Sequence, residues 1–138
     1  MNVLTFEIPG AIQPQERPRF SRKGKKVVTH DAPKSKDFKD FVKLVAYQYK
    51  PSELITEPIK LKADIYLMPP KKYRTGPKRK LIANGELRPT TKPDLDNLIK
   101  GIKDGCNKII WHDDSQIVDM TVRKFYSEQP RAEVTIEW

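Results

Sequence analysis

Cysteine and histidine are scarce in this chain, and their scarcity excludes several kinds of site. The sequence holds one cysteine, Cys106, and two histidines, His30 and His112. A disulfide within the chain is therefore impossible, and these three residues cannot build a Cys/His metal cluster. The histidines lie too far apart in sequence to indicate a catalytic triad. We expect a reducing, cytoplasmic compartment, where a lone thiol stays free.

Long apolar runs are missing as well. No stretch approaches the roughly 20 residues that span a membrane, so we expect no membrane partner. The first residues, 1–7, lack the basic region and apolar core of a signal peptide. Only 37% of the residues are hydrophobic and 33% are charged, which indicates large exposed loops around a modest core. The length of 138 residues fits one domain, 1–138.

What the chain has in excess is positive charge. Lys and Arg number 27 against 18 Asp and Glu, which gives a net charge of +9. A field of that sign attracts polyanions. Nucleic acid is the commonest such partner in the cytosol, ahead of acidic proteins and membrane surfaces. The simpler alternative is a basic protein whose charge only keeps it soluble.

Two segments without clear periodicity hold much of this charge. Residues 17–26 include six basic residues around Phe20, and residues 69–92 include eight Lys or Arg and one Glu. A structureless loop as long as 69–92 is usually functional or disordered. We expect both segments to hold a phosphate backbone, although they could be only solvated faces. The DNA-binding candidates are Arg17, Arg19, Arg22, Lys23, Lys71, Lys72, Arg74, Lys78, Arg79 and Lys80.

Two amphipathic helices are predicted. From Phe38 to Tyr49, apolar residues recur at helical spacing, and the whole stripe, Phe41 included, is expected to face the core. Ser35 is the expected N-cap of this helix. Residues 94–107 predict a second helix, whose apolar stripe consists of Leu95, Leu98, Ile99, Ile102 and Cys106.

Five strands are predicted around these helices. Their expected ranges are 3–8, 26–30, 59–68, 117–126 and a last strand through Val134, Ile136 and Trp138. The order is strand, helix, strand, basic loop, helix and a final β-hairpin. It predicts a single α+β domain with a mixed, mostly antiparallel sheet and two packing helices.

The acidic residues gather at two places. Asp94 and Asp96 open the second predicted helix, and Asp113 and Asp114 follow Trp111 in a polar turn. If this helix–turn–strand unit brings the pairs together, they offer the hard oxygen ligands that Mg²⁺ prefers. A bound Mg²⁺ can activate water for phosphodiester cleavage. Lys100 is four residues after Asp96 on the same helix face, where it could hold a phosphate oxygen.

Each of these residues also has a simpler interpretation. Asp94 could only cap the helix, and Asp96 could only complement the helix dipole or form an exposed ion pair with Lys100. Asp113 and Asp114 could belong to a plain turn. From spacing alone, a metal nuclease and a non-catalytic nucleic-acid-binding module both stay open.

An ordered pattern near the C-terminal end of the chain narrows this choice. It runs KPDLDNLIK at 92–100, then Asp104, then DDSQI at 113–117, and then Lys124. The pattern resembles the RusA family of Holliday junction resolvases. The opening strand, the Pro- and Arg-rich segment after it and the first helix also fit that family, so the resemblance spans nearly the whole chain.

The resemblance implies a bacterial or phage-encoded, nucleoid-associated homodimer that nicks four-way DNA junctions symmetrically, in recombination and repair. The cofactor would be Mg²⁺, with Mn²⁺ as a substitute, and a C2 dimer would present two identical sites to the junction. A metal nuclease for other branched DNA is the alternative. The implied roles are Asp94, Asp96 and Asp114 as metal-binding catalytic carboxylates, Asp113 as a further metal ligand, Lys100 as the catalytic lysine, Asn97 and Asp104 as supporting residues, and Lys124 as a DNA contact.

Overall fold

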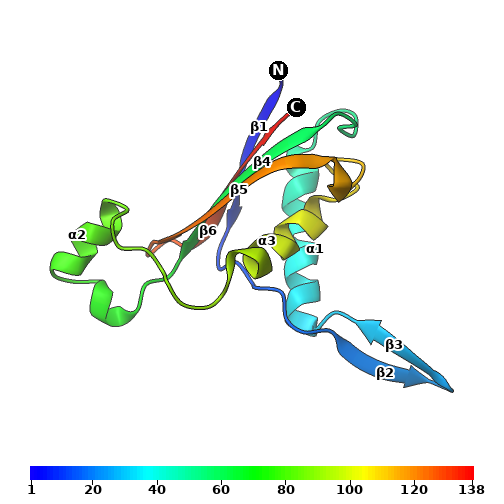
Figure 1. Cartoon of the computed structure of the whole chain (residues 1–138), viewed down its shortest axis with the longest axis horizontal. Coiled ribbons are helices and arrows are strands. Elements are labelled where there is room, and N and C mark those ends of the chain that lie inside the picture. Colours follow the sequence, from blue (N-terminus) through cyan, green and yellow to red (C-terminus); the bar gives the residue numbers. More distant parts are fainter.

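A four-stranded sheet organises the chain (Figure 1). In the computed structural model, which describes residues 1–138, the strand order is β1-β6-β4-β5. The strands are β1 (Val3–Pro9), β6 (Arg131–Glu137), β4 (Ile59–Leu67) and β5 (Ile117–Tyr126). β6 pairs antiparallel with both β1 and β4, whereas β4 and β5 run parallel. The predicted α+β fold with a mixed sheet is confirmed.

The expected C-terminal β-hairpin is wrong. β5 and β6 are not neighbours, because β4 lies between them. β6 buries every second side chain, Ala132, Val134 and Ile136, whereas no residue of β5 is fully buried. A strand with such a regular apolar face gains most from a central position, with paired strands on both sides. The short 127–130 connection keeps the two strands close but does not make them adjacent.

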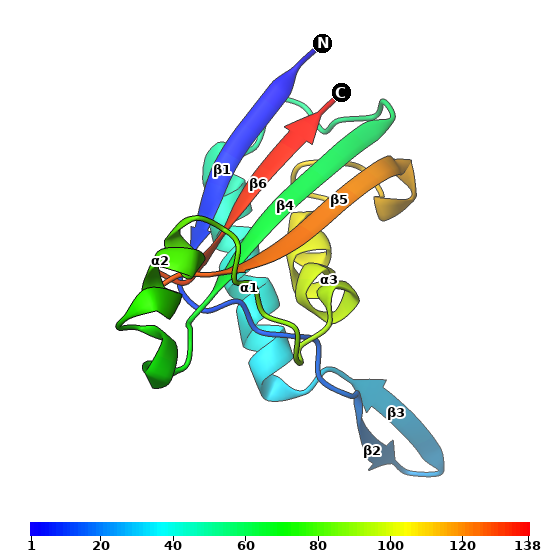
Figure 2. The same ribbon diagram turned by 60° about the vertical axis from the view of Figure 1, so that its left-hand side comes forward.

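Two helices cover one face of the sheet (Figure 2). They are α1 (Pro33–Tyr49) and α3 (Leu95–Cys106), and they pack side by side over the buried side chains of β4. Their close approach depends on two glycines of α3. A Cβ atom at Gly101 would lie 2.8 Å from the ring of Phe38, and one at Gly105 would collide with Val42. None of the helices has the length and apolar character needed to cross a membrane.

The first helix differs from its prediction at both margins. Its N-cap is Ala32 and Pro33 opens the first turn, so the expected N-cap at Ser35 is wrong. Ser35 is instead buried, and its Oγ accepts a hydrogen bond of 2.9 Å from the backbone N–H of Glu16. Phe41 is 39% exposed and Tyr49 is 45% exposed. The core-facing stripe is therefore narrower than predicted.

A two-stranded hairpin projects from the body of the molecule (Figure 1). It consists of β2 (Arg19–Lys23) and β3 (Lys26–His30), which pair antiparallel around a turn where Gly24 has a φ of +63°. β3 was predicted, but β2 was taken for irregular chain. Every residue of the hairpin is exposed, so β2 carries no alternation of buried and exposed positions from which a strand could be read.

The segment from residue 69 to residue 92 forms a second projection, which we call the α2 arm. It contains a 3₁₀ helix, η1 (Lys71–Tyr73), and a short α-helix, α2 (Pro77–Ala83). The prediction of a structureless loop is therefore wrong. Neither helix has a buried residue, so the sequence carries no apolar stripe to reveal them.

Candidate active site

The start of α3 presents two unpaired carboxylates. Asp94 occupies the N-cap position, but its side chain makes no capping hydrogen bond. Asp96 lies in the first turn, and both residues are exposed. Neither carboxylate has an ion-pair partner in the chain. Simple helix capping therefore does not explain Asp94, and both side chains are available to a ligand.

A lysine from β5 fixes the backbone just before these carboxylates. The Nζ of Lys124 donates hydrogen bonds of 2.8 Å to the carbonyl of Thr91 and 3.0 Å to that of Pro93. The carbonyl of Asn97 accepts a bond of 2.9 Å from the backbone N–H of Gln15. Lys124, expected to contact DNA, therefore holds the approach to Asp94, and Asn97 supports the first turn through its backbone.

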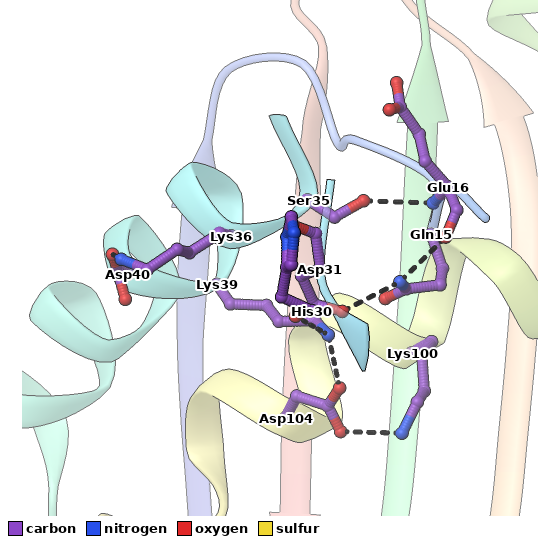
Figure 3. A network of polar contacts seen from close by, with 10 residues as sticks. All are labelled: Gln15, Glu16, His30, Asp31, Ser35, Lys36, Lys39, Asp40, Lys100 and Asp104. Atoms are coloured by element: carbon purple, nitrogen blue, oxygen red, sulfur yellow. Dashed lines mark hydrogen bonds and ion pairs between the residues drawn. The ribbon is translucent and has the colours of Figure 1, made fainter. Parts of the chain in front are cut away.

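Lys100 belongs to a chain of ion pairs that joins α3 to α1 (Figure 3). Its Nζ lies 3.0 Å from Oδ1 of Asp104, and Lys39 lies 2.9 Å from the other oxygen of Asp104. Lys39 also reaches Asp31 at 2.7 Å. The alternative of an Asp96–Lys100 ion pair is wrong, because Lys100 turns toward the C-terminal end of α3. Asp104 thus supports Lys100, and the Lys100 side chain remains 52% exposed.

The inner part of this network is firmly ionised. Burial raises the pKa of Asp104, but hydrogen bonds from Lys39 and Lys100 outweigh it and hold that pKa below its ordinary value. The hydrogen bond from Lys39 likewise lowers the pKa of Asp31. The sequence analysis missed Lys39. The available signal was its place between Phe38 and Val42, on the buried side of α1.

The second acidic pair lies in the turn before β5. Asp113 caps a 3₁₀ helix, η2 (Asp114–Gln116), by accepting bonds from the backbone N–H, at 2.9 Å, and the hydroxyl of Ser115. These bonds lower the pKa of Asp113. A structural turn thus accounts for Asp113. Asp114 differs, since its Oδ1 accepts a bond of 2.7 Å from Nε1 of the fully buried Trp111, while its Oδ2 has no partner.

The two carboxylate pairs lie at opposite ends of α3. The backbone N–H of Ile110 bonds to the carbonyl of Cys106 at 2.9 Å, so Trp111 and Asp114 follow the last turn of the helix. Burial, with a smaller contribution from Asp114, raises the pKa of Cys106 to about 12. A helix of 12 residues is about 18 Å long. The turn therefore leaves Asp114 far from Asp94 and Asp96.

A single chain does not gather the expected metal ligands. No group of three or more His, Cys, Asp or Glu side chains lies close enough to hold an ion. The expectation that the helix–turn–strand unit brings both pairs together is wrong for one chain, because the turn delivers Asp113 and Asp114 to the C-terminal end of α3. A pocket of about 370 Å³ between the α2 arm and the β5–β6 turn holds Tyr66, Tyr73 and Tyr126 and none of these carboxylates.

Two basic projections flank the start of α3. Figures 1 and 2 both place this helix terminus between the β2–β3 hairpin and the α2 arm. The predicted basic residues of the hairpin segment, Arg17, Arg19, Arg22 and Lys23, are exposed and without ion pairs. In the α2 arm, Arg79 lies 3.7 Å from Glu128, and Arg74 donates to the carbonyl of Pro69. Lys71, Lys72, Lys78 and Lys80 are exposed.

Comparison with known proteins assigns this arrangement to a family. A family model described as endodeoxyribonuclease RusA matches residues 9–137. The chain belongs to the RusA family. This membership indicates a nuclease that acts on branched Holliday junction DNA.

Two relatives extend the comparison. The RusA-family chain is 47% identical over 137 residues to "Uncharacterized protein YqaN" of Bacillus subtilis (strain 168), covering 99% of this chain and 96% of that protein. It is also 44% identical over 48 residues to "Crossover junction endodeoxyribonuclease rusA" of Lactococcus phage r1t, covering 34% of this chain and 37% of that protein. The first relative supports the fold over the full length, and the second supports the nuclease activity over a short stretch.

Proposed function

We propose that the protein is a Mg²⁺-dependent Holliday junction resolvase that makes paired, symmetric nicks during DNA recombination and repair. The observation that carries the proposal is the pair of unpaired carboxylates, Asp94 and Asp96, at a helix start between two basic projections. Acidic side chains seldom stand unpaired beside a basic surface unless they bind something, and a divalent cation is the ligand that would join them to DNA phosphates. RusA-family membership supports the same conclusion.

DNA binding falls to the two projections. Their exposed Lys and Arg side chains would neutralise phosphates on either side of the helix start, so affinity should fall steeply with salt. Phosphate contacts carry no sequence information, and preference for a junction over duplex would come from the shape of the branched DNA. The hairpin and the α2 arm project in different directions from the body, as arms of a junction require.

The proposed ligand set includes Asp94, Asp96 and Asp114, with Mn²⁺ able to replace Mg²⁺. Asp113 is the weaker candidate, because its carboxylate already caps η2. Lys100 would contact a phosphate, since its ammonium is half-exposed and is held at a fixed position by Asp104. Two nicks in a two-fold symmetric junction call for two matched sites, which a C2 homodimer provides.

The test is cleavage of a labelled synthetic four-way junction in Mg²⁺ or in EDTA, beside a linear duplex, a flap and a fork. Wild-type protein should nick the junction only with metal, and Asp96→Asn should lower the rate at least about 100-fold, because loss of a supporting residue alone costs about 10–100-fold. Asp37→Asn, an exposed carboxylate on α1, is the matched control and should cleave normally.

Other outcomes would change the assignment. Tight junction binding without cleavage in Mg²⁺ or Mn²⁺ would point to a non-catalytic nucleic-acid-binding module. Faster cleavage of flaps or forks would make the protein a metal nuclease for other branched DNA.

A further inference from the structure

We propose that each active site is completed by a second copy of this chain, with Asp94 and Asp96 of one protomer beside Asp114 of the other. The proposal rests on the proposed function. Its basis is that one chain places these carboxylates at opposite ends of α3, about 18 Å apart along the helix, and gathers no three ligands anywhere. Each end nevertheless keeps unpaired oxygens, two carboxylates at the start and Oδ2 of Asp114 at the other end.

One symmetry operation repairs this separation at both sites at once. α3 runs antiparallel to β5, since the end of β5 holds Pro93 through Lys124 while the start of β5 follows η2. A two-fold axis that crosses α3 and β5 near their midpoints exchanges the two ends. It brings the start of each α3 to the η2 turn of the partner and creates two identical sites.

The surface for this partner is the free edge of β5. β5 is the last strand of the sheet, and neither a helix nor another strand lies beyond it (Figure 2). Residues 118–121 are all exposed, including Val118 at 71% and Met120 at 45%. Unprotected apolar edge strands are uncommon, because they tend to pair with other strands. This edge also lies between the two acidic ends.

The register of such a pairing agrees with the position of the carboxylates. If two β5 strands pair antiparallel around Asp119 or Met120, the partner's Asp114 falls opposite residues 124–126. Lys124 lies in that stretch, and its Nζ holds the carbonyl of Pro93, the residue before Asp94. The edge pairing and the completion of the site are therefore satisfied by the same arrangement.

Gathering three carboxylates also links metal binding to assembly. Like charges brought this close repel unless a cation lies among them. A divalent ion that binds only the assembled site stabilises the dimer by mass action. Mn²⁺ should therefore shift the monomer–dimer equilibrium of wild-type protein toward the dimer, and should do so much less in Asp96→Asn or Asp114→Asn.

The decisive experiment uses heterodimers isolated with two different affinity tags. One heterodimer joins an Asp96→Asn chain to an Asp114→Asn chain. If sites are shared between chains, one site lacks both carboxylates and the other is intact. The heterodimer should then bind half as much Mn²⁺ as wild type and nick one strand, although both parental homodimers are inactive. A heterodimer without Mn²⁺ binding or nicking, beside an active wild type, would overturn the shared site.

A reciprocal heterodimer gives the matched control. It joins a wild-type chain to a chain with both substitutions, Asp96→Asn and Asp114→Asn. Shared sites predict that it neither nicks nor binds Mn²⁺ at full affinity, because each site lacks one carboxylate. Sites within single chains predict one intact site, and that result would overturn the proposal. Failure of wild-type protein to cleave any branched DNA would instead reject the proposed function.

The position of the partner can be tested by cross-linking. The only native cysteine, Cys106, is buried, so a single introduced cysteine reports its own surroundings. Met120→Cys should form a disulfide-linked dimer on mild oxidation, since facing residues of antiparallel strands lie about 4.5–5.5 Å apart. The controls are Val3→Cys on the opposite sheet edge and Leu44→Cys on α1, both exposed. Cross-linking by Leu44→Cys but not by Met120→Cys would overturn the β5 contact.

Discussion

The two ends of α3 carry similar acidic pairs in different environments. At the start, Asp94 and Asp96 are exposed and make no contact with the rest of the chain. At the other end, Asp113 caps a turn and Asp114 holds the indole of Trp111. The first pair contributes little to folding and is available for binding, whereas the second is partly structural. Residue type alone therefore does not reveal function, but the absence of an internal partner does.

The largest expected effect separates the two ends directly. Asp94→Asn should lower metal-dependent junction nicking at least about 100-fold while leaving thermal stability unchanged, because Asp94 has no partner in the fold. Asp113→Asn should do the opposite, with nicking largely kept and a lower melting temperature from the weakened η2 cap. Cleavage rates and thermal melts of both variants check this. Equal losses of nicking would break the distinction.

Asp114 combines both roles, and two substitutions can separate them. Asp114→Asn keeps an acceptor for Nε1 of Trp111, so it should abolish nicking and leave stability near wild type. Asp114→Ala should also destabilise the fold by about 1–3 kcal/mol, because it leaves a buried donor unpaired. Urea unfolding and junction cleavage measure the two effects. A stable Asp114→Ala would show that the indole bond is unimportant.

Lys124 tests whether the start of α3 must be positioned. Lys124→Met removes the donor to the carbonyls of Thr91 and Pro93, so nicking should fall about 10-fold, as for other supporting residues of a metal site. Junction affinity at low salt should stay close to wild type, because this ammonium already has partners. Gel-shift titration beside cleavage assays checks both parts. Loss of affinity with unchanged turnover would make Lys124 a DNA contact after all.

The basic projections should show the reverse pattern. Arg19→Gln and Arg22→Gln each remove an exposed charge of the hairpin, so each should lower the slope of log affinity against log salt by about 1. Turnover of bound junction should hardly change. Lys36→Gln, an exposed charge on α1 that pairs with Asp40, is the control and should leave the slope unchanged. Unaltered slopes for both arginines would remove the hairpin from the interface.

The smallest expected effect concerns acid stability. The pKa values of Asp31 and Asp104 lie below the ordinary 3.8 in the folded protein, so their contacts stabilise the fold above about pH 4. That contribution is lost as the pH falls through the lowered values. The stability difference between wild type and Asp104→Asn should therefore be larger at pH 7 than at pH 3. Urea unfolding at both pH values measures it, and an unchanged difference would contradict the network's role.

The sequence predicted those parts of the fold that have an apolar pattern. β4, β5 and both covering helices appear close to their expected limits, because each combines buried residues with a clear period. β2 and α2 were missed because they bury nothing. The neighbour of β6 was also wrong, since chain connections of similar length are compatible with several strand orders.

The candidate site was predicted in its residues but not in its geometry. Acidic residue type and spacing singled out Asp94, Asp96 and Asp114. The length of α3 between them could be estimated from the sequence, but the direction of the following turn could not. Lys39 and the clamp by Lys124 depend on contacts between elements far apart in the chain, which no local pattern records.

Mapping the cuts in a labelled four-way junction at nucleotide resolution tests the central claim most directly. With Mg²⁺, the wild-type protein should give paired nicks at symmetric positions on two opposing strands. EDTA or Asp96→Asn should remove them without loss of junction binding. Nicks that persist in Asp96→Asn or in EDTA would contradict the assignment of the start of α3 as the catalytic end.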